Sequence, residues 1–131
     1  MNGGIADNTI PLHLKPTDLL MSLLISYENG IHAVDAHYLR PRMAAVHLIE
    51  AADRVALVDT GTNDSLSRVI AALDELGYSK EQVEYIFLTH IHLDHAGGAG
   101  LMMQHFLNAR LVVHPRGARH MAEPSKLFAG V

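Results

Sequence analysis

Hydrophobic positions in the first part of the chain favour strands separated by short turns. Apolar residues dominate four short runs, 19–27, 31–39, 43–50 and 54–58. Glu28-Asn29-Gly30 separates the first two runs, and an Asn-Gly pair is a strong hairpin signal. Residues 1–18, which contain two prolines and a Gly-Gly pair, predict an irregular lead-in segment. Because the turns are short, we expect antiparallel pairing in this part of the sheet.

The spacing of apolar residues along the chain changes after residue 61. Five apolar side chains recur at helical spacing: Leu66, Val69, Ile70, Leu73 and Leu76. They predict a helix over 64–76, capped by Asn63 or Asp64 and ended by Gly77.

Further elements follow this helix in alternation. A strand over 83–88, a second helix over 98–107 and a strand over 109–113 come next, and Pro115 ends the last strand. Pro124 and Gly130 suggest an irregular tail. Alternating helices and strands predict parallel βαβ units, so the fold class is α/β (or α+β), with a mixed sheet and two main helices.

Chemically active side chains follow the ends of three predicted strands. Asp59, His90 and His114 each lie just beyond a strand's carboxyl end. In parallel sheets these ends meet at one edge, where ligands bind. We therefore expect the three residues to lie along a single edge.

Composition narrows the chemistry. The 131 residues suit one compact domain or part of a larger one, and the formal net charge of −4 predicts neither a nucleic-acid nor a membrane partner. The chain has ten His and no Cys, so a metal site would use nitrogen and oxygen ligands. Neither a signal peptide nor a transmembrane run is apparent, which predicts a cytoplasmic protein.

The segment His90-Ile91-His92-Leu93-Asp94-His95 concentrates four potential metal ligands in six residues. In an extended chain His90 and His92 point to the same side and can bind one ion, at about 2.0–2.1 Å for zinc. A turn toward Gly97-Gly98 brings His95 back beside Asp94, toward a second ion. Two ions roughly 3.5–4 Å apart can share a hydroxide and lower its pKa toward neutrality.

The segment Thr89–Gly98 resembles the T-H-x-H-x-D-H-x-G-G signature of the metallo-β-lactamase superfamily. Val58-Asp59-Thr60-Gly61 is similar to the family's upstream Asp-bearing strand end, and Val112-Val113-His114-Pro115 resembles the following strand of glyoxalase II-like members. The resemblance implies an αββα sandwich with two metal ions, zinc in most hydrolases. It implies His90 and His92 at one ion and Asp94 and His95 at the other. Asp94 would also orient or deprotonate the attacking water, and Asp59 would support the ligands.

The resemblance stops short of a complete site. The family supplies further ligands from later strands, whereas no Asp follows Asp94 here. We therefore expect residues 1–131 to form a single partial domain, about the first αβ half of the sandwich. Its sheet would keep an apolar face that favours a homodimer or another association.

The leading functional hypothesis is a hydrolase that uses a metal-bound hydroxide, with two zinc ions, on a small-molecule ester, thioester, lactone or lactam. One alternative is an iron-dependent, persulfide dioxygenase-like enzyme of the same superfamily, because the same ligands hold iron or manganese. The other is an inactive, truncated fragment that binds metal or dimerises.

Histidines and arginines near the end of the chain allow a functional and a structural interpretation. His114 is a candidate third metal ligand, although lining the pocket or capping the strand is the simpler interpretation. His120 and the basic residues of 116–119 are interpreted as a solvated turn. The histidines within strand runs, such as His32, fit hydrogen-bonded structural roles.

Overall fold

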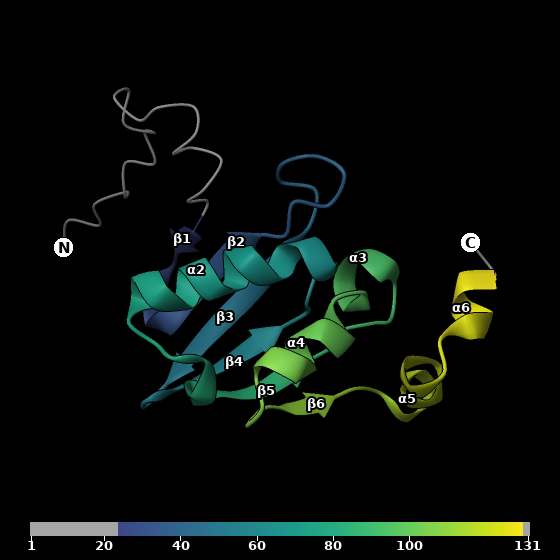
Figure 1. The fold of residues 1–131 in the computed structure, drawn as a ribbon. Helices are drawn as coiled ribbons and strands as arrows, with labels where there is room; N and C mark the ends of the chain where they lie inside the picture. The colour runs from purple at the N-terminus through teal and green to yellow at the C-terminus, as the bar shows by residue number, and fades with distance from the viewer. Residues whose placement is uncertain (1–23, 130–131) are drawn as a thin grey trace.

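A computed structural model describes residues 24–129 and shows one six-stranded sheet with helices (Figure 1). The strands are β1 (Leu24–Ser26), β2 (Ile31–Asp35), β3 (Ala45–Ala51), β4 (Arg54–Val58), β5 (Val83–Phe87) and β6 (Arg110–Val112). The helices are α2 (Leu66–Leu76), α3 (Leu93–Ala96), α4 (Ala99–His105), α5 (Pro115–Ala122) and α6 (Ser125–Ala129). Strands lie in the sheet in chain order.

Strand pairing divides the sheet into two parts. The pairs from β1 to β4 are antiparallel, and β4, β5 and β6 are parallel. This confirms the predicted mixed sheet, with antiparallel strands first and parallel strands after the change in apolar spacing. The strand predicted over 19–27 is described only from Leu24 onward; its first residues and the lead-in segment 1–18 lie outside the described residues.

The core lies between one face of the sheet and helices α2 and α4, which cover that face in Figure 1. Leu48 and Leu57 from the strands, Leu73 from α2 and Phe106 after α4 are almost fully buried there. Gly77 ends α2 in a left-handed conformation, as predicted. The predicted cap at Asn63 or Asp64 is wrong, because these residues lie inside a 3₁₀ turn (Asn63–Ser65) that precedes α2. Thr62 and Ser65 form a capping box at the start of that turn.

The opposite face of the sheet is apolar and open. Ile25, Ile31, Ile49, Phe87 and Val112 expose between 37% and 44% of their surface. The register places them on one face, since Ile31 pairs with Ile49 and Phe87 with Val112. Among residues 24–129 no helix is long and apolar enough to cross a bilayer.

Two segments differ from the sequence prediction. The strand expected over 31–39 ends at Asp35, because His37, Leu39 and Arg42 adopt positive φ values incompatible with a strand. The Asp35 carboxylate stabilises this loop by accepting hydrogen bonds from the backbone N–H groups of His37 and Arg42.

The tail expected to be irregular instead forms α5 and α6, so the basic residues of 116–119 lie on a helix rather than in a turn. Pro115 occupies the first turn of α5, where its missing N–H costs nothing.

Candidate metal centre

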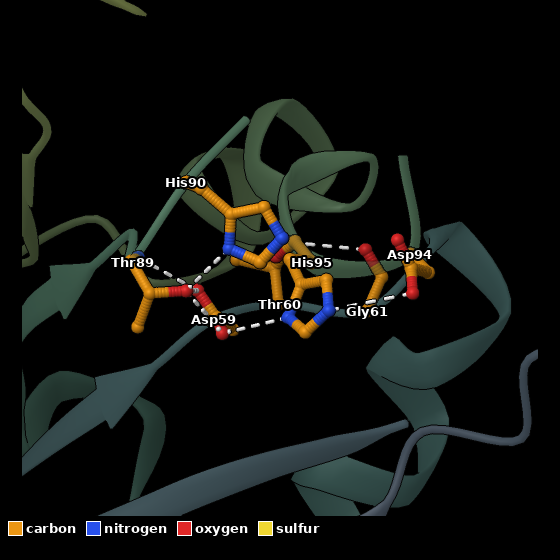
Figure 2. Close-up of polar contacts among 7 residues, drawn as sticks. All are labelled: Asp59, Thr60, Gly61, Thr89, His90, Asp94 and His95. Carbon is orange, nitrogen blue, oxygen red and sulfur yellow. Dashed lines mark hydrogen bonds and ion pairs between the residues drawn. The ribbon is translucent and has the colours of Figure 1, made fainter. Parts of the chain in front are cut away.

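The candidate centre lies where β4 and β5 end side by side. The backbone N–H of Asp59 donates to the Phe87 carbonyl at 2.7 Å, which extends the parallel pairing by one residue. Asp59 then adopts φ +62°, a left-handed conformation that is uncommon outside glycine. Its carboxylate lies against the segment after β5, as expected from the shared strand edge (Figure 2).

Asp59 makes most of the side-chain hydrogen bonds described for the centre. It is 6% exposed, and both carboxylate oxygens accept hydrogen bonds. Oδ1 accepts from the Thr89 backbone N–H at 2.8 Å, and the Thr89 hydroxyl lies 2.9 and 2.8 Å from Oδ1 and Oδ2. Oδ2 lies 2.9 Å from Nδ1 of His95. These contacts engage both carboxylate oxygens, an arrangement typical of a carboxylate that orients metal ligands.

The hydrogen bonds define the proton positions on two histidines. A carboxylate only accepts, so Nδ1 of His95 carries the proton that it donates to Asp59. The Thr89 hydroxyl gives its single proton to Asp59, so its oxygen accepts from Nδ1 of His90 at 2.8 Å. In their neutral forms both imidazoles therefore present a free Nε2 lone pair. Their ring centroids lie 4.1 Å apart.

The other two predicted ligands lie beside this pair. Asp94 Oδ2 is 3.3 Å from Nε2 of His95, and His92 contacts the His90 ring edge-on, with centroids 4.8 Å apart. His92 precedes α3 as its N-cap and is exposed. Potential ligand atoms of Asp59, His90 and His95 come within 4.8 Å of one another, a group that includes neither His92 nor Asp94. The predicted pairing of His90 with His92 at one ion therefore stays a prediction.

A main-chain frame holds the loop in place. The Thr60 N–H and hydroxyl both donate to the His95 carbonyl, at 2.7 and 3.0 Å, and the Gly98 N–H donates to the Gly61 carbonyl at 2.8 Å. A Cβ at Gly98 would lie 2.6 Å from the Thr62 carbonyl oxygen, so only glycine fits. Thr60 and Thr89 were not singled out by the sequence interpretation, although both lie inside the segments that it quoted.

The donor set fits a transition-metal ion. In neutral His95 the Nε2 lone pair faces a carboxylate oxygen at 3.3 Å with no proton between them, and a cation relieves that repulsion. Imidazole and carboxylate ligands suit zinc, iron and manganese. The predicted ligand set of His90, His92, Asp94 and His95 stays a prediction, and of these His90 and His95 lie in the group of closely spaced ligand atoms.

His114 has a different role. It is the N-cap of α5, and its Nδ1 accepts from the Arg116 backbone N–H at 3.2 Å. The neutral ring therefore carries its proton on Nε2, which makes it a donor rather than a metal ligand.

Comparison with known proteins agrees with this geometry. Residues 39–130 match the family model of the metallo-beta-lactamase superfamily. The chain belongs to this superfamily. It is 31% identical over 70 residues to an uncharacterized protein, YobT, of Bacillus subtilis (strain 168), covering 53% of this chain and 29% of YobT. It is 29% identical over 90 residues to an N-acyl homoserine lactonase of Bacillus sp, covering 51% of this chain and 34% of the lactonase.

Solved structures show the same fold. A metallo-beta-lactamase from Cronobacter sakazakii, a mutant of its HARLDQ motif, superposes with a TM-score of 0.65 at 24% identity. The match covers 76% of this chain and 37% of that structure. The chain thus spans about a third of the length of the proteins that it resembles.

Proposed function

We propose that this chain provides the metal-binding half of a hydrolase active site, with two zinc ions and a small-molecule substrate that contains an ester, thioester, lactone or lactam bond. One observation carries the proposal. Asp59 and Thr89 fix the protons of neutral His90 and His95 on Nδ1, so that both Nε2 atoms carry a lone pair, and that of His95 faces Asp94 Oδ2 at 3.3 Å. This carboxylate–histidine arrangement is typical of metal ligands in proteins.

A bound zinc pair would supply Lewis-acid activation of water near neutral pH. The chain's own residues would supply the proton acceptor and the orientation of the ligands. Asp94 is the half-buried carboxylate at the loop, and we assign it the role of orienting or deprotonating the attacking water. Asp59 keeps the ligand rings in place throughout. The similarity to an N-acyl homoserine lactonase makes lactones the first substrates to test.

Metal analysis and hydrolysis assays test the proposal together. The full chain is purified without added metal, analysed for bound elements, loaded with zinc and assayed against lactones, thioesters, esters and β-lactams. We expect stoichiometric metal and a His92→Ala variant with reduced metal content and hydrolysis. The control is His47→Ala, because His47 is exposed on the open sheet face and is not among the closely spaced ligand atoms. Protein without stoichiometric metal, together with a His92→Ala variant as active as wild type, rejects the proposal.

The same experiment separates the two alternatives. Iron as the element retained during purification favours the persulfide dioxygenase-like enzyme. Stoichiometric zinc without hydrolysis of any substrate favours a non-catalytic fragment that binds metal.

We also propose that the open sheet face associates with a second copy or with another layer. Its exposed side chains, such as Ile31, Ile49 and Phe87, form a contiguous apolar surface of the kind that marks interaction sites. Sedimentation velocity tests this, and a strictly monomeric chain at high concentration contradicts self-association.

A further inference from the structure

A pocket with a partly polar lining adjoins the metal loop. It has a volume of about 370 Å³ and lies between the ends of β5 and β6 and helix α5. Its polar lining consists of Thr89, His90, His114, Arg116 and His120. No acidic residue lines it, so a cationic guanidinium and three imidazoles surround the space without a compensating carboxylate.

Helix α5 is positioned over the metal loop by a glycine. Gly117 is buried, and a Cβ there would lie 2.8 Å from the Ile91 side chain and 3.2 Å from that of Val113. Ile91 separates the two metal-loop histidines, His90 and His92, so α5 packs directly on that loop. Arg116 and His120 are four residues apart and therefore lie on the same side of the helix.

The pocket offers hydrogen-bond donors. The Nδ1 of His114 accepts from the Arg116 backbone, so its Nε2–H is a donor. Within residues 24–129 the Arg116 guanidinium forms no ion pair, and five N–H donors are available to a ligand. Donors without an internal acceptor beside a cationic group match anionic oxygen atoms.

We propose that His114, Arg116 and His120 form a subsite for an anionic oxygen group of the substrate, a carboxylate or a phosphate. The inference rests on the proposed function, because the pocket shares His90 with the metal loop. An anion held there lies beside the loop and orients the neighbouring scissile bond toward it.

Titration of the metal-free chain tests the subsite by binding rather than by activity. Acetate and inorganic phosphate are added separately while the imidazole signals of His114 and His120 are followed by NMR. The anion that binds more tightly shows whether the subsite prefers a carboxylate or a phosphate group. We expect saturable shifts, and an Arg116→Gln variant with affinity lowered about tenfold. Arg119→Gln is the matched control, since Arg119 lies on the same helix outside the pocket.

Several outcomes decide the inference. Shifts that do not saturate overturn it, as does an equal loss in the Arg116→Gln and Arg119→Gln variants, which indicates a general charge effect. Because no metal is present, the result is independent of the proposed function. A saturable anion site in a chain that fails to bind metal supports the anion site while overturning the hydrolase proposal.

Discussion

Two histidines of this chain bind a carboxylate, and they do so with opposite consequences. His32, on an antiparallel strand, uses both ring nitrogens internally: Nε2 lies 2.7 Å from Glu50 and Nδ1 lies 2.8 Å from the Ser26 hydroxyl. His95, in the short helix α3, hydrogen-bonds Asp59 through Nδ1, and its Nε2 lies 3.3 Å from Asp94 Oδ2. The ring of His32 thus has both nitrogens in hydrogen bonds within the fold, whereas neutral His95 keeps an Nε2 lone pair that faces another predicted ligand.

Location explains this difference. His32 is 7% exposed and points to the covered face of the sheet, where an unpaired ring nitrogen would be costly. His95 is partly exposed in α3, where an ion can reach it. A carboxylate partner is therefore common to both histidines, and they differ in what the second ring nitrogen faces.

The largest expected effect follows from removing the His95 imidazole. We expect His95→Ala to lower metal affinity by about 100-fold or more, beyond the range typical for supporting residues. Zinc titration against a competing chelator measures it. His105→Ala is the control, because His105 is an exposed helical histidine outside the site. Unchanged affinity in the His95→Ala variant contradicts the assignment.

A smaller loss of metal affinity is expected for Asp59→Asn. The amide group cannot accept on both sides, so the contacts with His95 and Thr89 are no longer all satisfied and the rings are less well oriented. We expect affinity to fall about 10–100-fold. Asp53→Asn, at an exposed turn, is the matched control. If Asp59→Asn binds zinc as tightly as wild type, Asp59 does not orient the ligands.

The corresponding change at the structural histidine should affect folding alone. His32→Phe removes the partner of Glu50 and costs about 1–3 kcal/mol, near the lower limit because the Glu50 side chain is 29% exposed. Urea unfolding measures it, with His47→Phe as control. Zinc affinity should stay at the wild-type value, and a parallel loss of affinity would show that the two histidines are not independent.

The smallest effect involves Tyr78, which also interacts with Glu50. Burial, followed by the charge and hydrogen bond of Glu50, raises the pKa of the Tyr78 phenol above its ordinary 10.0. The folded state then holds this proton after the unfolded state has released it, so the stabilisation is complete below pH 10.0 and is lost as pH rises through the folded pKa. The difference in Tm between wild type and Tyr78→Phe should narrow from about pH 7 to about pH 11. A difference in Tm that stays constant with pH contradicts the raised pKa of Tyr78.

The sequence predicted the parallel part of the sheet well. Strand β4 was predicted to the residue, and α2 and β5 nearly so, because their apolar spacing is regular and Gly77 is an unambiguous stop. The placement of Asp59 beside the metal loop followed from strand direction alone.

Other features could not be derived from apolar spacing. The close approach of His90 to His95 depends on the short helix α3, whose four residues carry no periodic signal. Helix α5 was missed because Pro115 was interpreted only as the end of a strand, and the basic residues after it as a solvated turn. In the structure Pro115 begins the helix, and Gly117 provides the space against Ile91.

The main-chain frame beneath the metal loop has an evolutionary consequence. The bonds from Thr60 reach the His95 carbonyl oxygen rather than its side chain, so every residue type offers the same acceptor at position 95. A substitution at position 95 can therefore change the chemistry of the loop while these two main-chain bonds stay in place. One loop geometry can in this way serve enzymes of divergent specificity.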